Sequence, residues 1–495
     1  MDHPGYLRSL VRPLRLDEPA AGSLASRGLL GAIGIGVQGI QRFLITFLVA
    51  HVAGRDAVGV VATAVSTALL LSLLWPTTAG STASKFVAMA RGAGDTVLTR
   101  AVAAQLARRT VATTLLLAAA AVPLWMVLDG GSPADAACVA ALVIGYCGYS
   151  FTRGLQFGVG QVPRATAWDI LSAAGGLAGL VVVLLAGGRG PVLLLPLAAA
   201  YGLYTVAGWP HGARGRPAAA LRRELDEFVA LGVLGTVAST GLLQLSLLVA
   251  RIVAGTAGAG QYAVALSLAT PASLLAGSLS LVLFPSMAEA WGRGDIEGLR
   301  RQTDQATRAL IVVMVSVFGA LVLCSRLLVA VLYRAEYRPA ADVLPVLLMA
   351  VLATTLAVAT VNALTTRSRR GVVVASGAAV VGMLVGIVVW AVLAPHYGIM
   401  GVAIGYLCGT ATIAAIPFGA VWRGEHHEWA TLTGRLIAGL VLIVALVVVQ
   451  RALATSLWTD PAFAAVFVLG WAVLMHRDIG MATGMLRARR RRATG

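Results

Sequence analysis

Long apolar runs, separated by short polar or Gly/Pro-rich stretches, occupy most of the chain from residue 28 to residue 476. A helix needs about 20 mainly apolar residues to cross a hydrocarbon core of ~30 Å. Fourteen runs predict such helices, beginning near residues 28, 57, 110, 135, 168, 191, 228, 260, 307, 342, 372, 398, 434 and 460. The pattern therefore predicts an all-α integral membrane protein with about 14 transmembrane helices.

The segment from residue 28 to residue 95 recurs about 200 positions later, which indicates a tandem duplication. A shift of 201 aligns Val52, Ala53, Gly54, Gly59, Ala62, Ala64, Ser66 and Ala68 with Val253, Ala254, Gly255, Gly260, Ala263, Ala265, Ser267 and Ala269. A shift of 200 aligns Ala88, Ala90, Gly92, Gly94, Asp95, Arg100, Gln105 and Arg108 with Ala288, Ala290, Gly292, Gly294, Asp295, Arg300, Gln305 and Arg308. Each unit holds six helices, an even number, so we expect two parallel repeats.

The duplication and the polar connectors predict the division of the chain. We expect an amino-terminal arm (1–27), an N-lobe with helices one to six (28–210), a connector (211–227), a C-lobe with helices seven to twelve (228–420), two accessory helices outside the duplication (434–476) and a basic tail (477–495).

Composition and charge place the chain in a membrane. Of its 495 residues, 58% are hydrophobic and 12% are charged, which is too little polar surface for a soluble protein of this size. The net charge of +17 could suggest nucleic acid, but most of the Lys and Arg residues fall on one side of the predicted helices. This positive-inside pattern predicts that both termini are cytoplasmic and that the basic face meets anionic lipids, with no nucleic-acid partner. The four cysteines lie in apolar runs and are expected to pack there.

Three predicted helices carry a polar stripe at helical spacing, and the stripes supply the candidate substrate-binding residues. They are Gln38, Gln41 and Arg42 in the first helix, Arg153 and Gln156 in the fourth, and Gln244 and Arg251 in the seventh. An arginine inside a membrane costs at least a few kcal/mol, so Arg42 is a functional candidate. Snorkelling or a structural hydrogen bond is the alternative for Arg42. Arg153 and Arg251 lie nearer helix ends, where snorkelling to the interface is the alternative. For the glutamines, hydrogen bonds between helices are the alternative.

The positions of the acidic residues argue against an ion-coupled transporter and against an enzyme. Asp169, Glu289, Asp342 and Asp460 are interpreted as lying near helix ends, which leaves no carboxylate in mid-membrane. A proton- or sodium-coupled antiporter needs such a group. Glu425, His426, His427 and Glu428 lack zinc spacing and are interpreted as a solvated loop. No catalytic residue, metal or cofactor is expected.

Several stretches resemble the multidrug/oligosaccharidyl-lipid/polysaccharide exporter superfamily, and its polysaccharide flippase branch in particular. They are QRFLITFLVA from Gln41, GVVATAVS from Gly59, GQYAVALS from Gly260, LFPSMA from Leu283, LYRAEYRPAADVL from Leu332 and GIMGVAIG from Gly398. The resemblance covers roughly residues 28–420. It implies two six-helix lobes around a cavity that opens alternately to each side, and Arg42 matches the cavity arginine of the lipid II flippases.

The resemblance also implies the function: moving an undecaprenyl-diphosphate-linked oligosaccharide from the inner to the outer leaflet of a bacterial cell membrane, for cell-surface polysaccharide biosynthesis. A lipid II flippase is an alternative, although the alanine-aspartate motif of that branch has no match after Gly59. A multidrug antiporter of the MATE type is another. From a different class, an integral-membrane glycosyltransferase or ligase would need outer loops longer than those predicted. We expect a monomeric transporter rather than an enzyme, with a polymerase and glycosyltransferases as partners.

Overall fold

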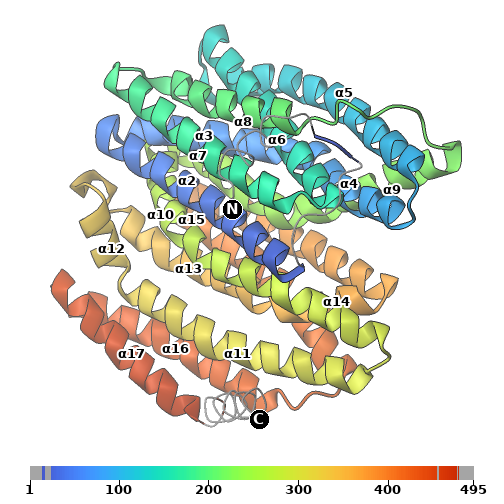
Figure 1. Cartoon of the computed structure of the whole chain (residues 1–495). Helices are drawn as coiled ribbons and strands as arrows, with labels where there is room; N and C mark the ends of the chain where they lie inside the picture. Colours follow the sequence, from blue (N-terminus) through green and yellow to red (C-terminus); the bar gives the residue numbers. More distant parts are fainter. Residues whose placement is uncertain (1–13, 17–23, 454–455, 477, 479–495) are drawn as a thin grey trace, which may run out of the picture. The chain divides into compact units, whose positions relative to one another are not determined.

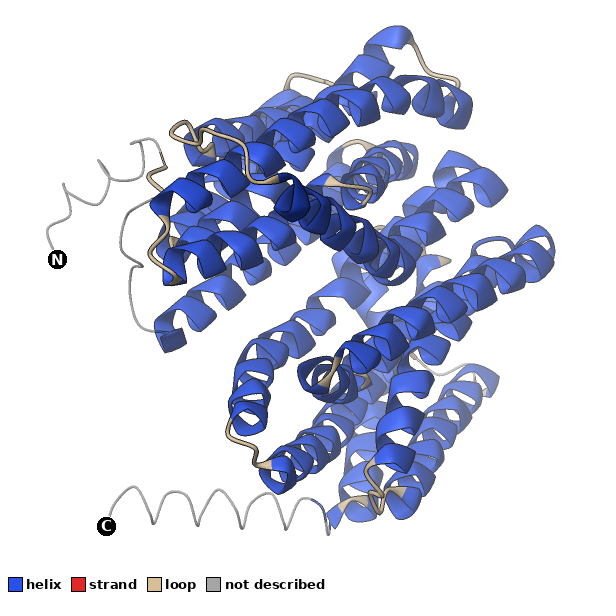
Figure 2. Ribbon diagram, turned by 90° about the vertical axis from the view of Figure 1, so that its right-hand side faces the viewer, coloured by secondary structure: helices blue, strands red, loops and turns tan. Residues whose placement is uncertain are grey.

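The computed structural model describes residues 14–16, 24–453, 456–476 and 478, and within them every regular element is a helix (Figure 2). Most of the predicted amino-terminal arm and all of the basic tail except Asp478 lie outside the described residues. The chain divides into two compact units, residues 1–267 and 268–495. The boundaries of the predicted lobes stay a prediction. The all-α class predicted from the apolar pattern is confirmed.

The first unit contains the helices drawn from blue to green in Figure 1. They are α2 (Leu24–Val52), α3 (Gly54–Leu73), α4 (Pro76–Gly92), α5 (Thr96–Asp129), α6 (Pro133–Val159), α7 (Val162–Leu185), the 3-10 helix η1 (Gly190–Leu194), α8 (Leu195–Gly208), α9 (Ala219–Thr236), the π-helical η2 (Val237–Gly241) and the first part of α10 (Leu242–Gly292). Helix α6 packs against α4, α5 and α8, and α2 packs against α7.

The second unit continues from α10 to the yellow and red helices of Figure 1. They are α11 (Ile296–Leu323), α12 (Ser325–Leu332), η3 (Ala335–Tyr337), α13 (Ala340–Leu356), α14 (Val358–Arg367), α15 (Arg369–Gly424), α16 (Ala430–Ala452), η4 (Leu457–Thr459) and α17 (Asp460–Leu474). The accessory helices α16 and α17 both pack on α11. There the Trp471 indole donates to the Val312 carbonyl oxygen at 2.9 Å.

Within the described residues, 12 helical stretches are long and apolar enough to cross a membrane. Two of them, Ala219–Pro271 with 53 residues and Arg370–Gly424 with 55, would each be about 80 Å long if straight. Each leaves helical geometry at a glycine with positive φ, Gly255 at 67° and Gly398 at 54°. Each stretch is thus long enough for two crossings. A multi-pass membrane fold is confirmed, and the count of fourteen stays a prediction.

The duplicated segments share local backbone structure. Gly54 and its counterpart Gly255 have φ of 82° and 67°, a region that glycine enters without steric cost. Asp95 caps α5 by accepting a hydrogen bond from the Leu98 amide at 2.8 Å. Its counterpart Asp295 caps α11 through the Gly298 amide at 2.7 Å. The shared sequence therefore encodes the same turns and caps in both copies.

The helix predicted to begin near residue 57 is divided into two in the structure. Helix α3 ends at Leu73, and Pro76 starts α4, which continues to Gly92. Helix α4 packs closely on α6. Gly80 allows this approach, because a Cβ there would lie only 2.6 Å from the Ser150 carbonyl oxygen.

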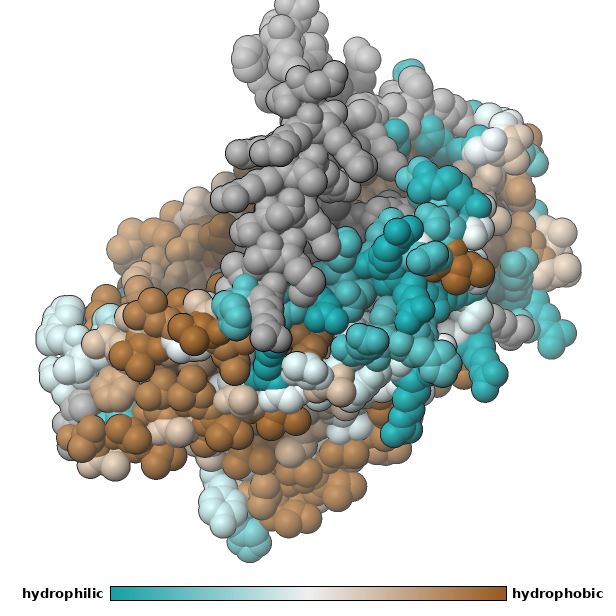
Figure 3. Space-filling model, turned by 90° about the horizontal axis from the view of Figure 1, so that it is seen from below, coloured by the Kyte–Doolittle hydropathy of each residue, from teal (hydrophilic) through white to brown (hydrophobic). Residues whose placement is uncertain are grey.

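Large apolar side chains remain exposed along the outer faces of the helices, as expected for a protein in contact with lipid. Leu116 is 70% exposed, Val182 65% and Val388 62%. In the view from below, hydrophobic side chains cover much of the visible described surface, and hydrophilic side chains gather in one part of it (Figure 3). Such a surface supports a multi-pass position in a membrane.

Candidate substrate-binding site

The polar stripe of α2 faces two tyrosines from other helices of the first unit. Arg42 Nη2 donates to the Tyr146 hydroxyl oxygen of α6 at 3.2 Å. The Tyr201 hydroxyl of α8 donates to Gln38 Oε1 at 3.0 Å and lies 3.4 Å from Gln41 Oε1. Spacings of three and four residues put the three α2 side chains on one face. The structure thus brings together three of the predicted site residues.

A small cavity lies beside Arg42. Its volume is about 10 Å³, which is room for about one water molecule. Its polar wall is Arg42, Tyr146 and Tyr201, and its apolar wall is Ile45, Val65, Ala68, Leu69, Leu142 and Leu197. In this conformation the cavity is too small for a diphosphate, so a larger ligand requires these helices to separate.

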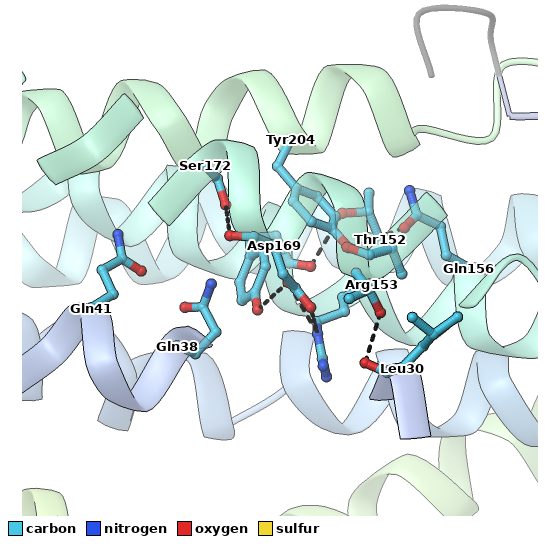
Figure 4. A network of polar contacts seen from close by, with 12 residues as sticks. Leu30, Gln38, Gln41, Thr152, Arg153, Gln156, Asp169, Ser172 and Tyr204 are labelled. Atoms are coloured by element: carbon cyan, nitrogen blue, oxygen red, sulfur yellow. Dashed lines mark hydrogen bonds and ion pairs between the residues drawn. The ribbon is translucent and has the colours of Figure 1, made fainter. Parts of the chain in front are cut away.

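A second polar cluster lies between α6 and α7 (Figure 4). Arg153 Nε donates to Asp169 Oδ2 at 2.9 Å, and the Tyr149 hydroxyl donates to Asp169 Oδ1 at 2.9 Å. The Asp169 side chain is fully buried. Gly34 of α2 makes room for this pair, because a Cβ there would contact the Asp169 carboxylate and Arg153. The placement of Asp169 near a helix end was wrong, since it lies eight residues into α7 and inside the fold.

Tyrosine rings connect the two clusters. Tyr149 packs on Tyr201 and on Tyr204, with 4.8 Å between ring centroids in both cases. Tyr204 also donates to Gln156 Oε1 at 3.0 Å, and Gln156 is fully buried. Sequence reasoning missed Tyr201 and Tyr204, although they repeat the three-residue spacing of Tyr146 and Tyr149. Tyr146 in turn contacts Tyr201, with 5.3 Å between ring centroids. A network of hydrogen bonds and tyrosine ring contacts therefore runs from Arg42 to Gln156.

A family model described as lipid II flippase MurJ matches residues 170–473, more than half of the chain. The chain belongs to the MurJ family of lipid II flippases. The matched region includes both accessory helices and begins after Arg42, Arg153 and Asp169. No curated protein matches the chain.

Solved transporter structures share the fold of this MurJ-family chain. An inward-facing multidrug resistance MATE transporter of the MOP superfamily is 14% identical, covers 82% of this chain and 98% of its own, and has a TM-score of 0.63. A MOP superfamily transporter from Pyrococcus furiosus is 16% identical, covers 84% and 98%, and has a TM-score of 0.59. A MATE transporter in the bent conformation is 15% identical, covers 81% and 94%, and has a TM-score of 0.57. At these identities the likeness shows the fold alone.

These findings establish the broad prediction and correct its finer part. The chain is a membrane transporter of the flippase type and not an enzyme, as the sequence predicted. Its membership of the exporter superfamily is confirmed. The predicted preference for the polysaccharide branch is not confirmed, because the family match favours the lipid II alternative.

Two predicted site residues of the MurJ-family chain, Gln244 and Arg251, lie outside the network. Arg251 of α10 pairs with Asp129 at the end of α5, with 2.5 Å between Nη2 and Oδ1. Gln244 is buried on α10, at 5% exposure. Arg153 does not snorkel but pairs with Asp169. Of the three predicted arginines, Arg153 and Arg251 are therefore neutralised by carboxylates.

The segment from Glu425 to Glu428 is a loop, as the sequence suggested, but it is only partly solvated: His426 and Glu428 are exposed, whereas His427 is buried. The Glu425 side chain is 6% exposed and pairs with Arg367 at 2.7 Å. His427 Nε2 lies 2.9 Å from Glu425 Oε2, and the His427 ring stacks on Trp429 at 4.4 Å between centroids. Among the described residues no group of three or more His, Cys, Asp or Glu side chains is placed to hold a metal ion. Within this loop, Glu425 thus forms an ionic contact with Arg367 at the end of α14.

Proposed function

We propose that this protein flips lipid II, the diphosphate-linked peptidoglycan precursor, from the inner to the outer leaflet of a bacterial plasma membrane by alternating access. The match to the lipid II flippase family supports this cargo. The observation that carries the proposal is the state of Arg42. It is half-buried in α2, beside a cavity, and the one hydrogen bond of its guanidinium in the described structure is to the Tyr146 hydroxyl.

An arginine in this position has charge to offer an anion. A guanidinium in a low-dielectric site is costly unless an opposite charge compensates it. Arg153 and Arg251 obtain that charge from Asp169 and Asp129, whereas Arg42 obtains only a hydroxyl dipole. A diphosphate would supply it, because its oxygens accept paired hydrogen bonds from the planar guanidinium.

The neighbouring groups suit the polar part of such a cargo. Gln38 Nε2 and Gln41 Nε2 are buried donors with no hydrogen-bond partner among the residues that the structure describes. Each buried donor without a partner destabilises the structure, and a bound acceptor would remove that penalty. In the proposed orientation both termini are cytoplasmic, the basic face meets anionic lipids, and the enzymes that make and use the cargo are the partners.

An undecaprenyl-diphosphate-linked oligosaccharide is the second candidate cargo. The observation that favours it is the missing alanine-aspartate motif after Gly59. It would use Arg42 in the same way, because the diphosphate is shared. A drug antiporter has less support, since the buried carboxylate Asp169 is neutralised by Arg153 instead of standing free for an ion.

The test is a flipping assay with purified protein in liposomes. Lipid II, a diphosphate-linked oligosaccharide of a different sugar sequence, and a cationic drug are supplied separately, and their appearance in the opposite leaflet or lumen is measured. We expect lipid II to flip fastest. Faster transfer of the oligosaccharide would establish the second candidate, and transport of the drug alone would overturn both.

A further inference from the structure

A cavity of about 290 Å³ lies in the first unit, between α5 and the segment 209–218 that joins α8 to α9. Helix α5 lines it with Ala104, Arg108 and Val111, among others, and the joining segment contributes Trp209 and Ala213. The volume is near the lower end of the range for small-molecule sites, ~300–1,000 Å³. The Lys and Arg distribution predicts that the joining segment is cytoplasmic, so we expect the cavity at the inner face of the membrane.

Arg108 brings to this cavity a positive charge that no carboxylate neutralises in the part of the chain that the structure describes. Its Nη2 donates to Gln105 Oε1 at 3.2 Å and to the Gly215 carbonyl oxygen at 3.1 Å, and both acceptors are uncharged. Because both bonds use the same nitrogen, Nε and Nη1 are left for a ligand. Asp226 of α9 pairs with the neighbouring Arg109, at 3.2 Å, and not with Arg108.

The duplication supplies a comparison for Arg108. At a shift of 200, Arg108 matches Arg308 of the second unit, and Ala104 matches Asp304. Arg308 Nε lies 2.9 Å from Asp304 Oδ2, and Arg308 Nη1 lies 2.9 Å from Asp478 Oδ1. The second copy therefore surrounds its arginine with two carboxylates, whereas the first copy has an alanine and a cavity. A bound anion would take the place of those carboxylates in the first copy.

The apolar wall of the cavity indicates which kind of anion fits. Val111 lies three residues after Arg108 and is 44% exposed, and Leu115, one turn further along α5, is 58% exposed. This spacing puts Arg108, Val111 and Leu115 on one face of α5, which continues from the cavity along the exposed apolar part of the helix. Trp209 adds a side chain that is typical of membrane interfaces. A ligand with a phosphate beside Arg108 and acyl chains along Val111 and Leu115 is a membrane lipid.

We propose that this cavity binds the headgroup of an anionic phospholipid of the inner leaflet. The lipid phosphate accepts hydrogen bonds from the planar Arg108 guanidinium. Arg214 and Arg216 of the joining segment are exposed and form no ion pair with a described residue, so they add positive charge next to Ala213. Basic cavities at the cytoplasmic ends of membrane helices bind lipid headgroups in this way. The site shares no residue with the Arg42 network and does not depend on the identity of the cargo.

One substitution should give the first copy the character of the second. Ala104→Asp introduces a carboxylate four residues before Arg108, as in the second unit, so it should pair with Arg108 and exclude a phosphate. Arg108→Ala removes the phosphate ligand itself. Ala104→Asn is the matched control for Ala104→Asp, because asparagine has the size of aspartate without its charge. Arg223→Ala is the control for the loss of one positive charge, since the Arg223 side chain is 85% exposed on the predicted cytoplasmic side.

Native mass spectrometry of the purified full-length protein tests the site. Delipidated protein is titrated with phosphatidylglycerol or with phosphatidylcholine, and the dissociation constant of the first bound lipid is determined. We expect the parent to bind phosphatidylglycerol roughly ten-fold more tightly than phosphatidylcholine, which is the effect of one hydrogen bond to a charged group. Arg108→Ala and Ala104→Asp should each remove this preference, and Ala104→Asn and Arg223→Ala should keep it.

A parental preference for phosphatidylglycerol in both Arg108→Ala and Ala104→Asp would overturn the site, and so would its loss in either control. If Arg108→Ala does not fold, Ala104→Asp decides the question, because it adds a partner for Arg108 instead of removing a side chain. Competition by an equal concentration of glycerol phosphate would identify a site for soluble anions, and displacement by lipid II would identify a site for the cargo. Either result would overturn the phospholipid. None of these measurements involves flipping, so the outcome is independent of the lipid II transfer assay.

Discussion

Arg153 of α6 and Asp169 of α7 form an ion pair in which 2.9 Å separates Nε from Oδ2 and the carboxylate is fully buried. The Tyr149 hydroxyl donates to the same carboxylate, so its two oxygens are both used. This pair neutralises the only arginine near Arg42 in the described network. The one predicted cavity arginine that keeps an uncompensated charge is therefore Arg42.

The ion pair should matter for stability. In Asp169→Asn the Arg153 guanidinium loses its counter-charge while it remains largely buried, with 21% of its side chain exposed. Removing one partner of a buried pair costs roughly 3 kcal/mol. We expect a lower Tm for the purified protein and partial recovery in the double variant Asp169→Asn/Arg153→Gln. An additive loss in the double variant would show that the two residues are not coupled.

The sequence predicted the features that follow from helical spacing and from the internal duplication. Helical spacing was sufficient to put Gln38, Gln41 and Arg42 on one face, and the duplication located Gly54 and Gly255 as equivalent turns. It did not give the partners of these side chains, because those come from other helices. Asp169 was misplaced for this reason: its burial depends on how α7 packs against α2 and α6.

The segment from Glu425 to Glu428 shows the same limit. Its polar composition suggested a solvated loop. His426 and Glu428 are exposed as expected, but His427 is buried against Trp429 and Glu425 pairs with Arg367. None of these contacts follows a sequence period. Polar composition alone therefore does not distinguish a solvated loop from a buried ionic cluster.

The predicted topology can be tested directly. The Lys and Arg distribution places the turns near residues 130 and 395 outside and the connector near residue 215 inside. A reporter that is active only outside the cell should be active when fused after Gly130 or Pro395. A reporter that is active only in the cytoplasm should be active when fused after Gly215 or at the carboxyl end. An internal result after Pro395 would mean that Arg370–Gly424 does not cross twice, and the total would then fall below fourteen.

The accessory helices should depend on Asp460. Its side chain is fully buried and accepts hydrogen bonds from Gln450 Nε2 at 2.5 Å and from the Leu327 amide at 3.2 Å. Asp460→Ala leaves the Leu327 amide without this acceptor, at roughly 1–3 kcal/mol. It also removes one of the two acceptors of Gln450 Nε2, which still donates to the Leu323 carbonyl oxygen at 3.0 Å. We expect a clear fall in Tm, while Asp342→Ala, which removes an exposed pair with Arg451, should change it little. Equal effects of the two variants would contradict the assigned role of Asp460.

Arg42 provides the sharpest test of the diphosphate site. Alanine removes the charge, lysine keeps the charge but not the planar fork, and glutamate repels a diphosphate. We expect Arg42→Ala to lower lipid II transfer per folded molecule at least 100-fold, Arg42→Lys to retain part of it, and Arg42→Glu to be inactive. Abundance and Tm should stay close to those of the parent, because in the described structure Arg42 makes one hydrogen bond to a hydroxyl and no ion pair.

Arg251→Ala is the matched control for that series. It also removes a membrane arginine, but one that is paired with Asp129, so it should lower the Tm more than it lowers transfer per folded molecule. If Arg42 instead anchors the fold, its variants should behave like Arg251→Ala and lose abundance together with activity. Arg42→Ala with normal abundance and the parental transfer rate would rule out Arg42 as the diphosphate ligand. Arg153 would then be the next candidate, and binding there would require the diphosphate to displace Asp169 from its guanidinium.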